Sequence, residues 1–275
     1  MPPDAPAPPI LFPDSAGDFS IGLRPIAAGD WFQGGEADPA VRKDPLFAAH
    51  RDIVWGELEG SRPGQVEALC LVADSIGAPC GALDWPPLYT AARLVADDLC
   101  LMEPGSDGWR LAALSLSAGT YFTAAEALGK SLTALHDPVP GFADRFLSRV
   151  TRIFDNLPPD TILERRNWTV TNEGGLFAPD ADAVRARIAG ILPEAAGDAL
   201  HVRSERQTLR RLPRTGGALF TIRIWSRSLT EIGAENVLAE RFAAAWRGVS
   251  AEFAAYKHLG LYTPLVESWL RARGE

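Results

Sequence analysis

Apolar side chains recur every three or four residues in several stretches of this chain, which is the spacing that one face of an α-helix produces. The predicted helices cover residues 64–76, 88–100, 123–135, 142–157 and 234–258, and the last of these five is expected to be the longest. Thr123 and Glu126 have the spacing of a capping box. Asp180 is positioned to cap a short helix that ends near residue 192, and Thr263-Pro264 opens the final helix.

Alternating and β-rich stretches predict strands at residues 109–116, 161–170, 200–212 and 217–227. Pro213 to Gly217 separates the last two with turn-forming residues, which indicates a hairpin. Strands and helices do not alternate regularly along the chain. The pattern therefore favours an α+β fold with an antiparallel sheet over a parallel doubly wound one.

Six of the first 13 residues are proline, so residues 1–18 are expected to form a disordered or extended tail. No internal repeat or Ser/Gly-rich linker follows, and residues 19–275 are interpreted as one domain.

Composition removes several function classes. The net charge of −8 argues against nucleic acid or an anionic membrane as a partner, and no apolar run is long enough to span a bilayer. The first residues lack the basic-then-apolar order of a signal peptide, so a secretion leader is not expected. The three cysteines lack metal-like spacing, which favours a reducing, cytoplasmic location.

Seven arginines, no lysine and one acid lie between His201 and Arg227, a local charge of +7 − 1 = +6. Because the predicted hairpin also carries core-forming residues, these cations need anionic partners, either the protein's own acids or a bound anion. Two simpler interpretations are cations that guard an exposed strand edge and an ordinary salt bridge from Glu205 to Arg203 or Arg206.

Common catalytic motifs are missing. Gly129-Lys130-Ser131 resembles the end of a phosphate loop, but Ala124 stands where its first glycine belongs. GxGxxG after a strand, GxSxG and HExxH do not occur. Trp168, Trp225 and Trp246 are expected in the core.

His136 ends the predicted 123–135 helix on the face that carries Leu128 and Leu132. A single imidazole on an apolar helix face suits axial ligation of a haem iron. The alternative is a histidine that stabilises a helix C-terminus.

Five segments resemble one known family. They are Leu135 to Pro140, similar to "IHxPVP"; Glu164 to Trp168, similar to "RxNW"; His201 to Pro213, similar to "HLRxERQTLRRLP"; Val95 to Met102, similar to "VxEDLxLM"; and Gly22 to Ile26 with Trp31. The family is that of the haem-dependent oxidative N-demethylase alpha subunit, and the resemblance runs from about residue 20 to 260. The relatives' "CFPSxW" stretch reads Leu116 to Phe122 here, which bears on the substrate.

The resemblance implies a PAS-like antiparallel sheet whose surrounding helices enclose haem b. It further implies O2-dependent demethylation of a small methylated secondary amine, with formaldehyde released. Electrons would come from NADPH through a separate flavin and iron–sulfur reductase subunit.

Carried over by motif, His136 would be the proximal iron ligand, and the stretch Glu205-Arg206-Gln207 would line the distal pocket. Glu205 and Arg206 are the candidate catalytic residues, for holding a cationic amine and a bound oxygen species. Arg203, Arg210 and Lys130 are candidates for the haem propionates. Strand alternation separates Arg203 and Glu205 from Arg206 and Arg210, and which arginine serves which role stays open. A gas-binding haem sensor and a relative without haem are the alternative functions.

Overall fold

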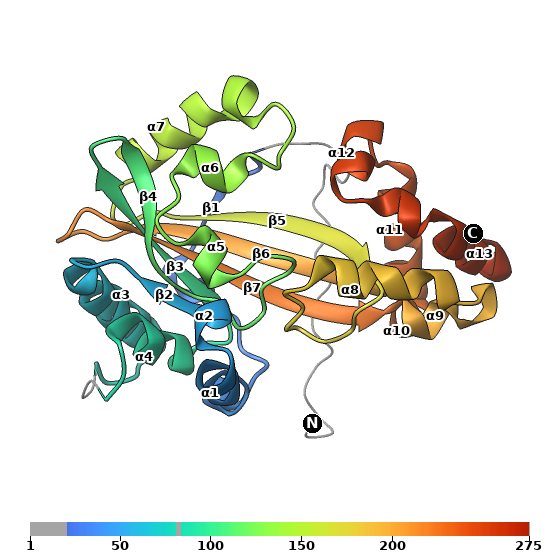
Figure 1. Ribbon diagram of the computed structural model, residues 1–275, viewed down its shortest axis with the longest axis horizontal. Coiled ribbons are helices and arrows are strands. Elements are labelled where there is room, and N and C mark those ends of the chain that lie inside the picture. The colour runs from blue at the N-terminus through green and yellow to red at the C-terminus, as the bar shows by residue number, and fades with distance from the viewer. Residues whose placement is uncertain (1–20, 81–83, 275) are drawn as a thin grey trace. The chain divides into compact units, whose positions relative to one another are not determined.

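The computed structural model describes residues 21–80 and 84–274, so the predicted tail at 1–18 lies outside the described residues. Within the described part, one open sheet has the strand order β1-β5-β6-β7-β3-β4-β2 (Figure 1). The strands are β1 (Arg24–Ile26), β2 (Trp55–Glu57), β3 (Asp98–Gly105), β4 (Gly108–Ser115), β5 (Ile162–Thr171), β6 (His201–Arg211) and β7 (Ala218–Ser228). The sheet is antiparallel, which confirms the predicted α+β class.

Four strands, β4 to β7, lie where the sequence predicts them, and Pro213 to Gly217 falls in the predicted turn between β6 and β7. β1, β2 and β3 were not predicted. The stretch predicted as one helix at 88–100 contains helix α4 (Pro87–Leu94), which ends early, and the first three residues of β3. Residues Asp98 to Met102 are buried and pair with β7, and Leu99 to Met102 also pair with β4 on the other side. A continuous apolar run is typical of such a central strand as well as of a buried helix.

Helices α3 (Arg62–Ser75), α8 (Ala181–Ala186) and α13 (Thr263–Arg273) confirm three predictions. Asp180 caps α8 by accepting a hydrogen bond from the backbone N–H of Ala183. The sequence did not predict four α-helices, which are α1 (Pro39–Ala49), α2 (Arg51–Val54), α9 (Ala196–Ala199) and α10 (Leu229–Gly233). Short 3₁₀ turns are η1 (Ala28–Asp30), η3 (Arg187–Gly190), η4 (Pro193–Ala195) and η5 (Leu259–Leu261).

The single helix predicted at 123–135 is wrong. Two short helices, α5 (Ala124–Ala127) and α6 (Leu132–His136), stand in its place. Gly129 between them has φ +77°, and its N–H donates to the carbonyl of Leu111 in β4. The predicted capping box of Thr123 and Glu126 is present.

The helix predicted at 142–157 begins as a π-helix, η2 (Ala143–Leu147), and continues as α7 (Ser148–Asn156). Residues 234–258 form α11 (Asn236–Arg247) and α12 (Ala251–Tyr256), interrupted near Gly248. With 14 residues α3 exceeds the 12 of α11, so the prediction of a longest helix at 234–258 is wrong.

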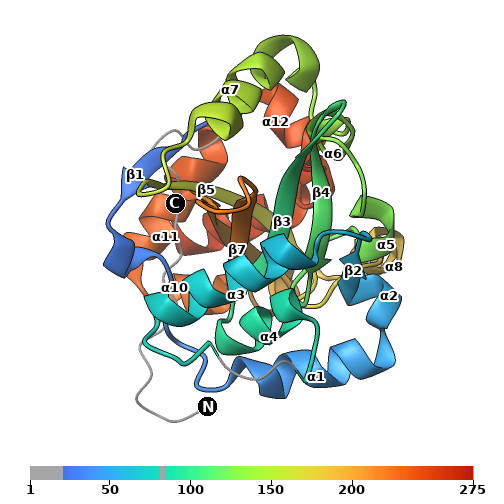
Figure 2. The same ribbon diagram turned by 90° about the vertical axis from the view of Figure 1, so that its left-hand side faces the viewer.

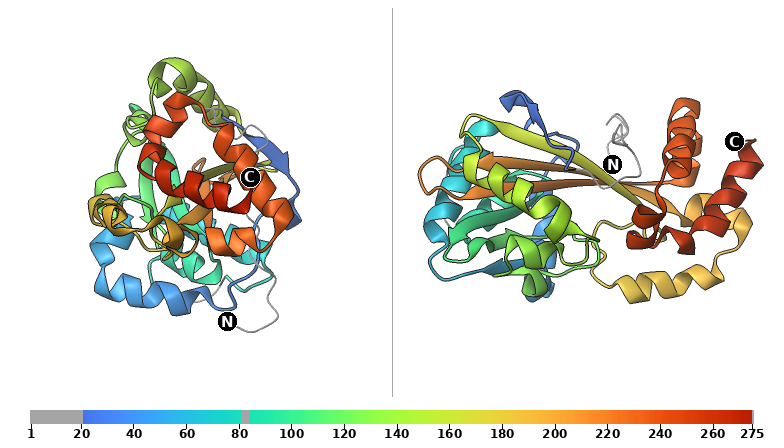
Figure 3. Two further views of the ribbon diagram at one scale, coloured as in Figure 1. Left: turned by 90° about the vertical axis from the view of Figure 1, so that its right-hand side faces the viewer. Right: turned by 90° about the horizontal axis from the view of Figure 1, so that it is seen from above.

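The described chain forms two compact units. The first contains residues 21–165 and 207–223, the second residues 166–206 and 224–274. In the first unit, α1, α3 and α4 lie on one side of the strands and α6 and α7 on the other (Figures 1 and 2). In the second, the C-terminal helices gather at one end of the long strands (Figure 3). The rings of Phe242 in α11 and Trp269 in α13 meet edge to face. Trp168 and Trp246 belong to the same hydrophobic core as Phe242, and Trp225 is also buried, as predicted.

Cys70 of α3 and Cys80 form a disulfide with their Cα atoms 5.2 Å apart, while Cys100 is a buried thiol. Spacing alone did not indicate this pair, because α3 and the turn after it bring the two residues together.

Candidate functional site

His136 is the last residue of α6. Ser131 caps this short helix by accepting a hydrogen bond from the N–H of Ala134. The Nδ1 atom of His136 lies 2.7 Å from the carbonyl oxygen of Leu132, which fits a ring that carries its proton on Nδ1 and donates it to that carbonyl. Nε2 makes no hydrogen bond with the residues that the structure describes. This nitrogen therefore presents a lone pair.

The imidazole of His136 is half-buried and stacks on Phe142, with ring centroids 4.0 Å apart and planes only 6° from parallel. Burial lowers the pKa of His136, and the nearby charge of Arg165 lowers it further, against the opposing effect of the Leu132 carbonyl. Burial and Arg165 both favour the neutral imidazole, the form in which histidine binds a metal.

The break between α5 and α6 means that the apolar helix face predicted around His136 is only partly present. Leu132 and His136 lie one turn apart in α6 as expected, but Leu128 precedes the break and is not part of that helix. Arg165 in β5 is a neighbour of His136 that the sequence reasoning missed. The "RxNW" stretch contains it, although nothing in that stretch points to α6.

Among the described residues, no group of three or more His, Cys, Asp or Glu side chains is arranged to hold a metal ion. The donor set is therefore a single imidazole nitrogen with its other nitrogen fixed by a carbonyl. That set fits a haem, which carries four of its own nitrogen donors and needs one more from the protein.

Lys130 lies in the exposed turn between α5 and α6. Its backbone carbonyl accepts a hydrogen bond from Leu111, whereas its ammonium group makes no hydrogen bond or ion pair with the described residues. The side chain is therefore available to an anion.

Arg203 is completely enclosed in β6 at 1% exposure. Its Nη1 and Nη2 atoms donate to the carbonyl oxygens of Gly175 (2.7 Å) and Leu176 (3.0 Å). Charge-assisted bonds to carbonyls are one way to stabilise a buried guanidinium. Arg203 thereby fixes the segment that follows β5.

Glu205 is half-buried and accepts a hydrogen bond from Nδ2 of Asn167 at 3.2 Å. Its neighbour Arg206 has no exposed surface. Successive strand residues face opposite sides of a sheet. Glu205 therefore shares the face of Leu209, which packs in one cluster with Phe154 of α7, and Arg206 shares the face of Thr208.

Arg210 lies on the second of these faces, where its guanidinium carbon is 4.5 Å from the ring centroid of Trp31. Trp31 itself donates from Nε1 to the hydroxyl of Thr208 at 2.9 Å. Burial lowers the pKa of Arg210, and Asp160 and Asp74 oppose this. Its Nε atom is buried and makes no hydrogen bond with the described residues.

Three other arginines of this stretch reach acids of the protein itself. Arg214 pairs with Glu67, Arg223 with Glu36 and Arg227 with Glu235. Acids of the protein itself therefore pair with part of this arginine-rich stretch. They are one of the two kinds of anionic partner that the sequence predicts.

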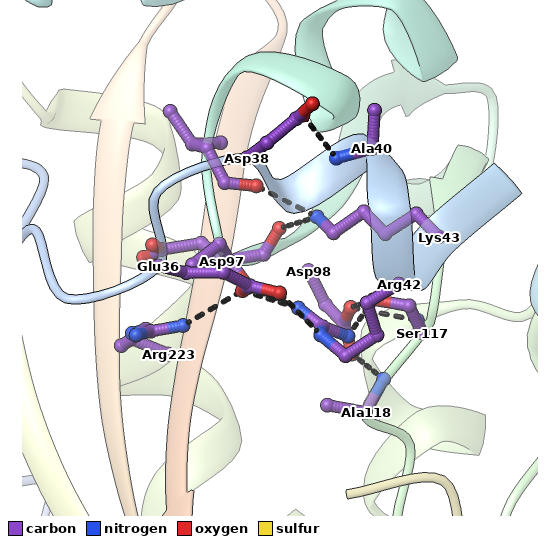
Figure 4. Close-up of polar contacts among 12 residues, drawn as sticks. Glu36, Asp38, Ala40, Arg42, Lys43, Asp97, Asp98, Ser117, Ala118 and Arg223 are labelled. Atoms are coloured by element: carbon purple, nitrogen blue, oxygen red, sulfur yellow. Dashed lines mark hydrogen bonds and ion pairs between the residues drawn. The ribbon is translucent and has the colours of Figure 1, made fainter. Parts of the chain in front are cut away.

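An ionic cluster that the sequence did not indicate connects α1 with two short segments, one just before β3 and one just after β4 (Figure 4). Arg42 forms a bidentate pair with Glu36 at 2.9 and 3.0 Å and donates to Ser117 and to the carbonyl of Ala96. Lys43 is buried and donates to the carbonyls of Val95 and Asp97. Burial lowers the pKa of Lys43 to about 8, opposed first by Asp98.

Asp98 anchors the start of the stretch 116–122 that follows β4. Its carboxylate accepts hydrogen bonds from the N–H of Ser117 (2.7 Å), the hydroxyl of Ser117 (2.8 Å) and the N–H of Ala118 (2.9 Å). The predicted helix at 88–100 concealed this role, since it placed Asp97 and Asp98 on a helix instead of at the start of a strand.

None of the helices described for this chain is long and apolar enough to traverse a bilayer. The family model for haem-dependent oxidative N-demethylase, alpha subunit-like, matches residues 79–266, more than half of the chain. The match includes α6, β5 and the whole of the β6–β7 hairpin.

Proposed function

Because the chain belongs to the haem-dependent oxidative N-demethylase alpha subunit-like family, we propose that it is the oxygen-activating subunit of such an enzyme and holds haem b through Nε2 of His136. The observation that carries the proposal is the geometry of this imidazole, which is fixed through Nδ1 and makes no hydrogen bond at Nε2 with the described residues. The antiparallel sheet and its helices are proposed to be the PAS-like haem fold.

Bound haem would supply the iron that activates O2. The chain's own residues would orient the haem ligand and select the substrate. Leu132 fixes the rotation of the His136 ring, and Phe142 covers one face of that ring against water. Glu205 is proposed to attract the cationic methylated amine, and Arg206 to stabilise negative charge on oxygen. Arg203, Arg210 and Lys130 remain the proposed propionate partners, and the buried Nε of Arg210 has a donor to offer. Electrons would come from a separate flavin and iron–sulfur subunit.

The test is the absorption spectrum of protein produced with a haem precursor, for wild type, His136→Ala and the matched control His50→Ala, since His50 is exposed. A Soret band in wild type and control that is lost or shifted in His136→Ala is expected. An unchanged band in His136→Ala would move the ligand to another group, and a colourless wild type would leave a relative without haem.

Amine turnover needs its own assay. Formaldehyde release from small methylated secondary amines is expected when reductant and O2 are supplied to the haem-loaded protein. Haem with reversible gas binding but no formaldehyde would instead identify a sensor.

A further inference from the structure

An aromatic path leads from His136 to the surface of the first unit. The His136 ring stacks on Phe142, and Phe142 lies 6.3 Å from Phe146, centroid to centroid. Phe146 is half-buried, and the guanidinium of Arg145 lies over its ring at 5.0 Å. Phe146 belongs to the π-helix η2, an uncommon element that is frequently found at functional sites.

Two exposed arginines lie just beyond this path. Arg149 and Arg152 are three residues apart in α7 and so point from the same side of the helix. Their guanidinium groups make no hydrogen bond or ion pair with the described residues. The one acid of α7, Asp155, instead accepts a hydrogen bond from Trp109.

The same two arginines border an open groove of about 590 Å³. Its other walls are largely apolar and come from the segment leading into β1, from α7 and from the start of β5. They include Ile21, Leu23, Ile153, Leu157 and Leu163. An apolar floor with arginines at its edge has the composition of a protein–protein interface.

We call this surface the α7 face and define it by Arg149, Arg152 and the groove. The net charge of the chain indicates which kind of partner would bind there. A protein with a net charge of −8 repels acidic proteins over most of its surface. Unpaired arginines on one face therefore attract an acidic partner and fix its orientation.

We propose that the α7 face docks an acidic protein domain that carries a one-electron [2Fe–2S] centre, and that electrons enter through Phe146 and Phe142 toward His136. The proposal rests on the proposed haem function for its second half. With haem bound, one electron would leave the reduced iron–sulfur centre, which would be oxidised, and would reduce the haem iron from ferric to ferrous. No bond is made or broken and no proton is transferred in this step.

Docking is tested by calorimetry with an acidic plant-type [2Fe–2S] ferredoxin at low ionic strength. Arg149→Glu/Arg152→Glu is compared with Arg241→Glu/Arg247→Glu, which changes the net charge equally on the exposed face of α11. The α7 variant is expected to raise Kd about tenfold or more, and the control far less. The difference should vanish at about 1 M salt, where the Debye length is roughly 3 Å.

Equal weakening in both variants, or no measurable binding by wild type, would overturn the docking proposal. A change of oligomeric state confined to the α7 variant, with ferredoxin binding unaffected, would instead assign the face to a second copy of this chain. Calorimetry needs no haem, so a colourless wild type that still binds ferredoxin through the α7 face would separate failure of the haem proposal from failure of docking.

The route of the electron is tested by stopped-flow reduction of the haem-loaded protein by reduced ferredoxin. Phe146→Leu is expected to slow reduction several-fold without changing Kd or haem content, and Phe146→Tyr, which keeps the ring, to restore the rate. An unchanged rate in Phe146→Leu would overturn the route.

Discussion

At the scale of single residues, the arginines between His201 and Arg227 show what a sequence can and cannot reveal. Their need for partners followed from charge and burial. The partners did not, because Arg203 uses carbonyl oxygens of Gly175 and Leu176, and Arg210 uses the face of Trp31. Such partners lie far away in sequence or carry no charge, so no local pattern indicates them.

Lys43 gives a prediction at this scale. Its pKa is lowered to about 8 by burial, against an ordinary value near 10.5 in the unfolded chain. Between those pH values the unfolded state binds more protons, so this group makes folding more favourable as pH rises from about 8 to 10. The charged groups around it are Asp98, Asp97, Glu36 and Arg42.

Urea unfolding of wild type and Lys43→Met, measured from pH 7 to 10, should therefore give a flatter dependence of unfolding free energy on pH in the variant. At pH 7 the variant is expected to be less stable by about 1–3 kcal/mol, because two buried carbonyls lose their donor. Parallel pH profiles above pH 8 would contradict the lowered pKa.

At the scale of elements, the predictions that rest on local residue types are confirmed. The predicted helix that is wrong fails because of a hydrogen bond to a strand distant in the sequence. The caps Asp180 and Thr123 and the hairpin around Pro213 were identified from residue types alone. The helix predicted at 123–135 failed because Gly129 leaves the helical conformation to bond with Leu111 in β4. His136 could be singled out from the sequence, whereas its stacking on Phe142 required knowledge of the turn between them.

Gly129→Ala tests the importance of this break. At φ +77° an alanine is strained even though its Cβ would meet only Leu58, at 3.8 Å. A loss of about 1–2 kcal/mol in unfolding free energy is expected. Gly190→Ala, where no neighbour lies within 4 Å and φ is ordinary, is the matched control. Equal effects of the two substitutions in urea unfolding would show that the break between α5 and α6 tolerates other conformations.

At the scale of the whole molecule, the pairing of cysteines is a property that composition did not anticipate. The chain has three cysteines, and the structure joins Cys70 to Cys80. Thiol titration of unreduced, denatured protein should therefore find one reactive thiol per chain, that of Cys100, and three after reduction. Three thiols before reduction would support the free-thiol chemistry of a reducing compartment.

The order of the strands in the sheet has a consequence for synthesis of the chain. β3 is apolar and central, and its second neighbour is β7, since Asp98 pairs with Ile222. More than a hundred residues must be translated between these two positions. At about 5–20 residues per second, one edge of β3 waits roughly 6–25 s for its partner on the ribosome. An unpaired apolar edge attracts other strands. A nascent chain of this protein is thus expected to depend on chaperone protection of β3 until β7 has emerged from the ribosome.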